Sequence, residues 1–240
     1  MDLTWYGHST WLVEVGTTSL LIDPFFQNPH TSHTSAEIAD PDYLLVTHGH
    51  QDHIADAGAF DGATVVATPE LSSFLRAEMG LEETIAGSGM NVGGTVQCDD
   101  AYVTMTAANH SNGFASSYER SAGPPAGFLI SDSEPRAGAQ PDATSFYHAG
   151  DTALISDMRS VIGDYLAPTA AALPIGDHFT MGPTQAAIAL GWLGVDRGFP
   201  MHYDTFGPIE TDPQEFVDAA AAHAETATVE VLAGDETVRL

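Results

Sequence analysis

The most conspicuous absence from this sequence of 240 residues is lysine, which does not occur once. Only six arginines stand against 33 acidic residues, so the formal net charge at pH 7 is −27. Proteins bind the phosphates of nucleic acids and anionic lipids through lysine and arginine. The sequence therefore argues against nucleic acid or a membrane surface as a partner, and we expect a small-molecule substrate.

The same charge imbalance indicates adaptation to concentrated salt. A small chain with so large a charge of one sign repels itself. The Debye length falls from about 10 Å at 0.1 M salt to about 3 Å at 1 M, so only concentrated salt screens this repulsion strongly. An acidic mesophilic protein is the alternative, but it does not account for the total absence of lysine. We therefore expect a halophilic source.

Cysteine and long apolar runs are also scarce. Cys98 is the only cysteine, which excludes an intramolecular disulfide and a thiolate metal cluster. We expect it to be a buried, small apolar side chain. No apolar run reaches the roughly 18 residues of a transmembrane helix. Residues 1–4 show neither the positive region nor the apolar core of a secretory signal, so we expect a cytoplasmic protein.

Metal-binding side chains gather in one short stretch, residues 48–53, which reads His-Gly-His-Gln-Asp-His. It follows an apolar run, residues 43–46, that is typical of a short buried strand. In extended chain His48 and His50 point the same way about 6.6 Å apart. Since Zn–N bonds measure about 2.0–2.1 Å, both imidazoles can reach one ion. Asp52 and His53 lie beyond the turn at the glycine and can reach a second metal position beside the first. A solvated polar loop is the alternative interpretation.

Three more residues of the same kinds occur downstream. His110, Asp151 and His202 each follow an apolar segment. Each is therefore expected at a strand end, near the other two and near residues 48–53. Four such motifs in order, spread over nearly the whole chain, are a much more specific signal than one.

Together these motifs resemble the metallo-β-lactamase superfamily, whose H-x-H-x-D-H signature matches residues 48–53. Within the superfamily, the chain is similar to small metal-dependent hydrolases related to the ascorbate-6-phosphate lactonase type. The stretches that carry this similarity are Tyr6–Ser9, Leu21–Phe25, Leu173–Gly176, Phe179–Pro183 and Pro200–Tyr203.

The resemblance implies an α/β fold, the αββα sandwich, in which two mixed β-sheets lie face to face with helices on their outer faces. Residues 1–240 are expected to form a single domain. The Ser-, Gly- and Pro-rich stretch 111–126 is expected to be a mobile loop at the active site. The last two strand-like segments, 228–232 and 236–240, are expected to pair as a hairpin. Helices are predicted over residues 69–79, 154–165, 184–192 and 213–223.

The resemblance also implies a dinuclear metal site. Its first ion would be bound by His48, His50 and His110, its second by Asp52, His53 and His202, and Asp151 would bridge the two. Ligands that offer only nitrogen and oxygen suit zinc, with manganese, iron and nickel as alternatives. A hydroxide between the two ions would attack a carbonyl or phosphoryl centre. Asp52 would in addition steer this nucleophile or carry a proton. The predicted activity is hydrolysis of a small ester, lactone or phosphodiester.

Other functions are compatible with the same motif. The first is an RNA phosphodiesterase, although the chain lacks an evident basic arm and its charge is adverse. The second is a di-iron protein that reduces oxygen or nitric oxide. The flavo-di-iron enzymes typically have a carboxylate where His50 stands and carry a flavin domain that this chain lacks. A non-catalytic metal-binding module is the remaining alternative, and the sequence leaves the oligomeric state open, a homo-oligomer included.

Four further residues are candidates for roles around this site. His178, in a glycine-flanked loop after a predicted strand, is the leading candidate for substrate contact or proton transfer. His8 either touches the substrate or is a hydrogen-bonded loop residue. Asp23 is expected to accept hydrogen bonds that orient the metal-binding loop. His148 is expected to be packed or hydrogen-bonded and not a ligand.

Overall fold

Two β-sheets packed face to face form the centre of the computed structural model, which describes residues 1–115, 117–135 and 143–240. The first sheet has six strands in the order β15-β1-β2-β3-β4-β5. It is mixed, because β3, β4 and β5 run parallel whereas β15, β1, β2 and β3 alternate in direction. Its strands are β1 (Asp2–Trp5), β2 (Trp11–Val15), β3 (Thr18–Ile22), β4 (Tyr43–Leu45), β5 (Thr64–Val66) and β15 (Glu236–Arg239).

The second sheet has seven strands in the order β14-β13-β12-β11-β10-β7-β6. It is mixed too, with β11 to β14 parallel and the remaining neighbours antiparallel. Its strands are β6 (Thr95–Cys98), β7 (Ala101–Ala107), β10 (Ala126–Ser131), β11 (Ser145–His148), β12 (Ala170–Pro174), β13 (Arg197–Met201) and β14 (Thr228–Val229). A separate pair, β8 (Gly113–Phe114) and β9 (Ser117–Ser121), lies beside the two sheets.

The main core fills the space between the sheets. Along β2 every second residue is fully buried, as expected for a strand with one face on the core. Trp11 of β2 packs its ring against Phe146 of β11 and Phe199 of β13, with centroid distances of 5.2 and 5.6 Å. All six residues of β10 are buried, because helices cover the outer face of the second sheet.

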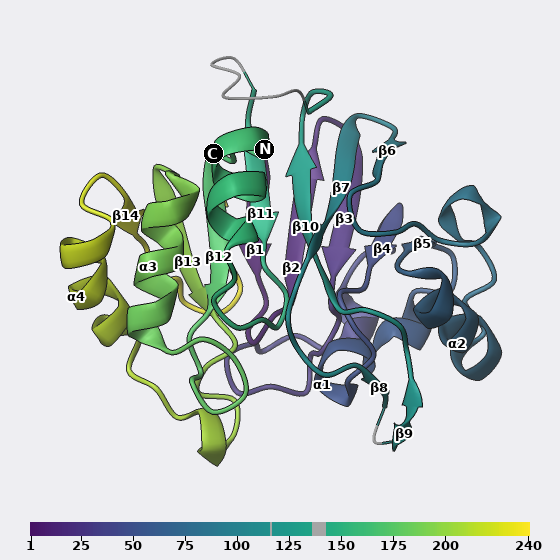
Figure 1. The fold of residues 1–240 in the computed structure, drawn as a ribbon. Helices are drawn as coiled ribbons and strands as arrows, with labels where there is room; N and C mark the ends of the chain where they lie inside the picture. The colour runs from purple at the N-terminus through teal and green to yellow at the C-terminus, as the bar shows by residue number, and fades with distance from the viewer. Residues whose placement is uncertain (116, 136–142) are drawn as a thin grey trace.

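Helices cover both outer faces and complete the predicted αββα order (Figure 1). The first sheet packs against α2 (Pro69–Met79), whose Leu71 and Leu75 lie in one apolar cluster with Leu44 and Val65. The second sheet is covered by α3 (Pro183–Leu193), α4 (Pro213–His223) and the π-helix η4 (Met158–Leu166). Short helical turns complete the set: α1 (Gln51–Ile54), η1 (Ser35–Glu37), η2 (Ala57–Ala59), η3 (Ile85–Gly87) and η5 (Gly207–Ile209).

Local sequence signals explain where the helices begin and end. Pro69 stands in the first turn of α2, and Gly80 ends it in the left-handed conformation with φ +74°. Asp212 caps α4 by accepting a hydrogen bond from the backbone N–H of Gln214. Among the described residues, no helix is both long and apolar enough to cross a membrane.

Three predictions about local structure need correction. The chain does not close with a hairpin: β14 adds to β13 in the second sheet, whereas β15 pairs with β1 in the first. The predicted helix at residues 154–165 is instead the π-helix η4, which begins at Met158. The stretch 111–126 is not a loop throughout, because it contains β8 and β9 and is bridged to the metal-binding loop between His50 and Ala115; its mobility stays a prediction. The pairing of β14 and β15 and the presence of β8 and β9 could not be predicted from the alternation of apolar and polar residues alone. Both depend on partner segments that are distant in the sequence or on pairing within the fold.

Candidate metal centre and active site

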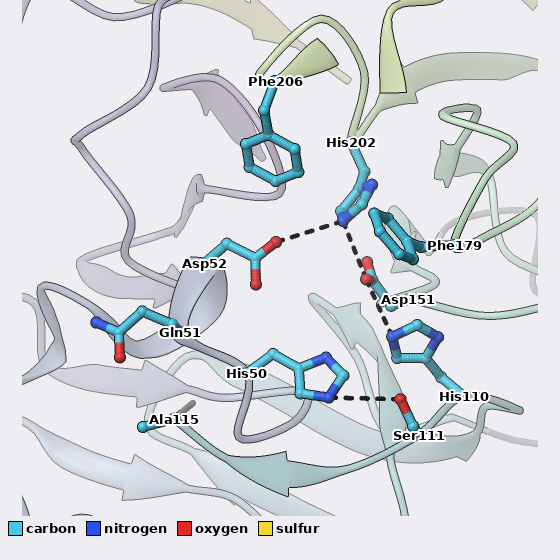
Figure 2. A pocket seen from close by; sticks show the side chains of 10 residues that line it. All are labelled: His50, Gln51, Asp52, His110, Ser111, Ala115, Asp151, Phe179, His202 and Phe206. Atoms are coloured by element: carbon cyan, nitrogen blue, oxygen red, sulfur yellow. Dashed lines mark hydrogen bonds and ion pairs between the residues drawn. The ribbon is translucent and has the colours of Figure 1, made fainter. Parts of the chain in front are cut away.

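The predicted ligands all lie beyond the carboxyl ends of strands at one edge of the sandwich. His48 follows β4 of the first sheet, and His110, Asp151 and His202 follow β7, β11 and β13 of the second. These three strands of the second sheet run parallel to one another, so their carboxyl ends meet at the same edge. The site is therefore shared by both sheets, as Figure 2 shows for the side chains that line it.

Three histidines form the first group of donors. The imidazoles of His48, His50 and His110 each place one nitrogen within 4.8 Å of the others. Nε2 of His48 lies 3.0 Å from Nδ1 of His50. The other ring nitrogen of His48 is 3.0 Å from the Thr47 hydroxyl, which leaves Nε2 directed toward the group. This arrangement matches the three histidines that were expected to share the first ion.

A second group lies beside the first. Asp52 and His53 project from α1, the single turn that begins one residue after His50. Together with His202 and His8 they bring four donor atoms within 4.8 Å of one another. Nε2 of His202 lies 3.8 Å from Oδ2 of Asp52. The helical turn is what separates the two groups, because it directs its side chains away from the strand-like course of residues 48–50.

Asp151 stands between the two groups. Its Oδ2 lies 3.0 Å from Nε2 of His202 in the second group, and 3.5 and 3.9 Å from Nε2 of His110 and His48 in the first. Figure 2 shows this carboxylate below His202 and above His110. The residue expected to bridge two ions is thus the one that contacts both sets of donors.

Asp23 holds the metal-binding loop from behind, as the sequence predicted. Its fully buried carboxylate accepts hydrogen bonds from the backbone N–H of Thr47 at 2.8 Å and from the Thr47 hydroxyl at 2.6 Å. Nδ1–H of His53 donates to the same carboxylate at 2.7 Å. This contact fixes the ring so that Nε2 is the nitrogen that faces the site.

His8 is a residue of the site that sequence reasoning left undecided. Its ring is fully buried and lies 4.1 Å from the His202 ring, measured between centroids. An ionised carboxylate can only accept, so Nε2–H of His8 donates to Oδ2 of Asp52 at 3.2 Å. Its Nδ1 lies 2.8 Å from the Thr205 hydroxyl, and its backbone carbonyl accepts from the N–H of His202 at 3.0 Å. His8 therefore joins Asp52 of α1 to the loop after β13 that carries His202.

Backbone conformations that side chains rarely adopt cluster here. His8, Asp23 and His202 have φ values of +49°, +45° and +54°, in the left-handed region that costs free energy for residues other than glycine. Gly150, directly before Asp151, has φ +62°, and a Cβ there would lie 2.5 Å from the Ala126 carbonyl oxygen. Surrounding hydrogen bonds hold these strained positions, which is typical of functional sites.

Burial keeps the first group of histidines neutral. It lowers the pKa of His50 to about 4, with a further contribution from His110. Burial and the proximity of His53 hold the pKa of His48 well below its usual value, and burial also lowers the pKa of His110. Neutral imidazoles keep a free lone pair, which is the form that binds a metal ion.

Buried carboxylates have the opposite effect on the pKa of His53 in the second group. Burial alone would lower the pKa of His53, but Asp151 and Asp23 outweigh it and raise that pKa well above its usual value. Burial opposes ionisation of Asp151, yet His202 and His53 hold its pKa well below the usual range. The buried carboxylates thus call for a positive charge in the space between them.

The donor set fits divalent metal ions. Within the described part of the chain, Nε2 of His53 and Oδ1 of Asp151 are buried without a hydrogen-bond partner, although they face each other at 3.5 Å. Buried polar atoms without partners are rare and call for an explanation. A cation bound by both atoms provides one, since it replaces the proton of His53 and satisfies the carboxylate.

A cavity of about 280 Å³ opens directly onto these donors. Two phenylalanines, Phe179 and Phe206, lie on the same side as His202, whereas Gln51 and Ala115 lie across from them (Figure 2). The lining residues are His50, Gln51, Asp52, His110, Ser111, Ala115, Asp151, Phe179, His202 and Phe206. A small molecule can therefore reach both donor groups at once.

Comparison with known proteins assigns the chain to a family. The family model described as the beta-lactamase superfamily domain matches residues 18–203. The chain belongs to the metallo-β-lactamase superfamily. It is 59% identical to a UPF0173 metal-dependent hydrolase of Haloquadratum walsbyi, over 99% of both chains. A UPF0173 metal-dependent hydrolase of Exiguobacterium is 43% identical, over 91% of this chain and 92% of that one.

A solved structure supports the same assignment. The chain is similar to a metallo hydrolase of the hyperthermophilic archaeon Ignicoccus hospitalis, with a TM-score of 0.82 and 35% identity. The similarity covers 99% of this chain and 97% of that one. The chain is accordingly a metal-dependent hydrolase with the metallo-β-lactamase fold.

Two other histidines of this metallo-β-lactamase-fold hydrolase lie apart from the metal centre. His178 is exposed and is not among the residues that line the cavity, although its neighbour Phe179 is. Its role in substrate contact or proton transfer stays a prediction. His148 is fully buried, and its ring nitrogens lie 3.0 Å from the Ser9 carbonyl oxygen and 3.2 Å from the Gly150 nitrogen, as expected for a packed residue.

Sequence reasoning did not identify Phe179, Phe206, Gln51 and Thr205 as parts of the site. A signal was present for Gln51, which lies inside the metal-binding stretch itself. Phe179 begins one of the stretches that carry the family resemblance, although nothing there marks it as a cavity residue. No periodicity or motif distinguishes Phe206 and Thr205, because only the fold brings their loop to this edge.

Proposed function

We propose that this metal-dependent hydrolase uses two divalent ions to cleave a small ester, lactone or phosphodiester. The observation that carries the proposal is the pair of donor groups with Asp151 in contact with both. Nitrogen and oxygen donors without thiolate suit zinc, manganese or iron. When bound, two such ions would lower the pKa of water to about 7 and polarise the substrate oxygen.

The chain's own residues prepare this chemistry in three ways. His48, His50 and His110 offer neutral imidazoles, and the last two line the cavity. Asp23 keeps the loop and the His53 ring in place through three hydrogen bonds. These contacts hold the donors before any ligand arrives, so little reorganisation is needed when the substrate binds.

Asp52 has two roles open to it. One oxygen, Oδ2, is held by His8, and the carboxylate lines the cavity. Although burial opposes it, the hydrogen bond from His8 holds the pKa of Asp52 below its usual range, so the group stays ionised at neutral pH. An ionised, partly exposed carboxylate at this position can accept a proton from the attacking water or orient it.

The test begins with metal content. Protein purified in concentrated salt is analysed by mass spectrometry for bound metals and assayed on p-nitrophenyl esters, lactones and bis(p-nitrophenyl) phosphate. We expect two ions per chain and turnover on at least one bond class. One ion per chain, or iron with no hydrolysis but with electron-donor consumption, would overturn the proposal.

Single substitutions separate the two donor groups. His50→Ala should remove one ion and His202→Ala the other, each with a loss of turnover, because each deletes a donor from a different group. His223→Ala is the matched control, since His223 is exposed on α4 and does not line the cavity. Full metal content and activity in either of the first two variants would refute the assignment of that residue.

A further inference from the structure

Two aromatic side chains at the mouth of the cavity call for an explanation. Phe179 is 50% exposed and Phe206 is 37% exposed. The described residues expose only six large hydrophobic side chains, and two of them line this one cavity. Exposed apolar groups gathered beside polar groups are typical of a ligand-binding site.

The two rings occupy one side of the site, next to the metal donors. Figure 2 shows them on either side of His202. The Phe206 ring lies 5.6 Å from the ring of His8, and the Phe179 ring meets the edge of the His178 ring at 4.5 Å, both between centroids. The phenylalanines reach the cavity from two different loops, one after β12 and one after β13. They form an apolar wall that a substrate would contact while its reacting bond faces the donors.

Among the described residues, neither lysine nor arginine lines the cavity. None of its lining residues is an arginine, and the described arginines are engaged elsewhere. Arg76, Arg120, Arg197 and Arg239 pair with acidic residues, and Arg159 lies over the ring of Trp192. A second anionic group on a substrate would therefore find no arginine or lysine partner among the described lining residues, in a protein whose net charge is −27.

We propose that the substrate is a small carboxylic ester or lactone whose acyl part carries an aromatic or branched apolar group, seated against Phe179 and Phe206. This inference rests on the proposed function and narrows it. Water supplies the new C–O bond at the acyl carbon, the bond to the alcohol oxygen breaks, and a proton from the water passes to that oxygen. The products are a carboxylic acid and an alcohol.

The experiment compares two esters that differ only in the acyl group. The ratio of kcat/KM for p-nitrophenyl phenylacetate to that for p-nitrophenyl acetate is measured for the wild type and for Phe179→Ala and Phe206→Ala. Each variant should lower this ratio about tenfold, the effect of a lost apolar contact in a binding pocket. Tyr165→Ala is the matched control, because Tyr165 is an aromatic residue 51% exposed on η4, outside this cavity. Its ratio should stay at the wild-type value.

A binding measurement gives a readout that does not depend on turnover. Calorimetric titration should show that phenylacetate binds more tightly than acetate to the wild type, and that both phenylalanine variants lose this difference. If the protein hydrolyses the esters but neither phenylalanine variant changes the kcat/KM ratio of phenylacetate to acetate ester, this inference is wrong. The proposed function would then still stand. Faster turnover of bis(p-nitrophenyl) phosphate than of either ester would overturn this inference too. No turnover on any substrate would overturn the proposed function and this inference with it.

Discussion

Replacing Asp23 by asparagine tests how the site is held together. The carboxylate is fully buried and accepts three hydrogen bonds, two from Thr47 and one from His53. Oδ2 alone accepts two of them. An amide has one acceptor oxygen and places an NH₂ group where the other oxygen stood. The Asp23→Asn variant must therefore lose at least one bond and bring two donors face to face.

The expected magnitude follows from these contacts. A hydrogen bond to a charged group contributes about 1.5–3 kcal/mol, and a buried donor left unpaired costs about 1–3 kcal/mol. We expect Asp23→Asn to lower the free energy of unfolding by roughly 2–4 kcal/mol, which is about 4–16 °C in Tm for a chain of this size. Because Asp23 also orients the His53 ring, affinity for metal should fall about 10- to 100-fold.

The assay combines thermal unfolding with a metal competition titration, both in concentrated salt. Asp42→Asn is the matched control, because Asp42 is an exposed carboxylate that also accepts two hydrogen bonds, at 2.8 Å each, from Ser19. It should change stability by about 1 kcal/mol or less and leave metal affinity unchanged. An Asp23→Asn protein that binds metal as tightly as the wild type would refute the reasoning.

Four further predictions concern His8, pH, salt and His178. His8→Ala removes the 3.2 Å contact to Asp52, so one of the two ions should bind about 10- to 100-fold more weakly while the other is unaffected. A calorimetric titration in which both ions bind the variant as tightly as the wild type would contradict this. Burial lowers the pKa of His8 to about 3 and that of His50 to about 4, so between those values and the unfolded value of 6.5 the unfolded chain binds more protons. Metal-free protein should therefore lose stability as the pH falls from about 6.5 to about 4, and a Tm that stays flat or rises over this range, in chelator and concentrated salt, would count against it. Concentrated KCl should raise the Tm because it screens a net charge of −27; a Tm that falls or does not change with KCl would remove the argument for salt adaptation. If His178 transfers a proton, His178→Ala should lower kcat with little change in KM, and an unchanged kcat would exclude that role.

The sequence alone was sufficient to identify the donor residues of the candidate metal centre. The stretch at residues 48–53 carries four donors within six positions, and strand geometry already directs His48 and His50 to the same side. The apolar runs before His110, Asp151 and His202 were sufficient to place these residues at strand ends. Such local patterns can be read from the sequence because they depend on residues only a few positions apart.

The tertiary structure decided what surrounds these donors. His8 and Asp52 lie 44 positions apart, and His8 and Thr205 are separated by 197, yet each pair is within hydrogen-bond distance. Phe179 and Phe206 meet the same cavity from separate loops. The final strands joined different sheets for the same reason, since a strand's partner depends on which edge is open in the folded chain. Candidate metal-binding residues can be recognised in a sequence by their type and spacing. A substrate pocket is lined by common side chains, and only the packing of distant segments brings these together.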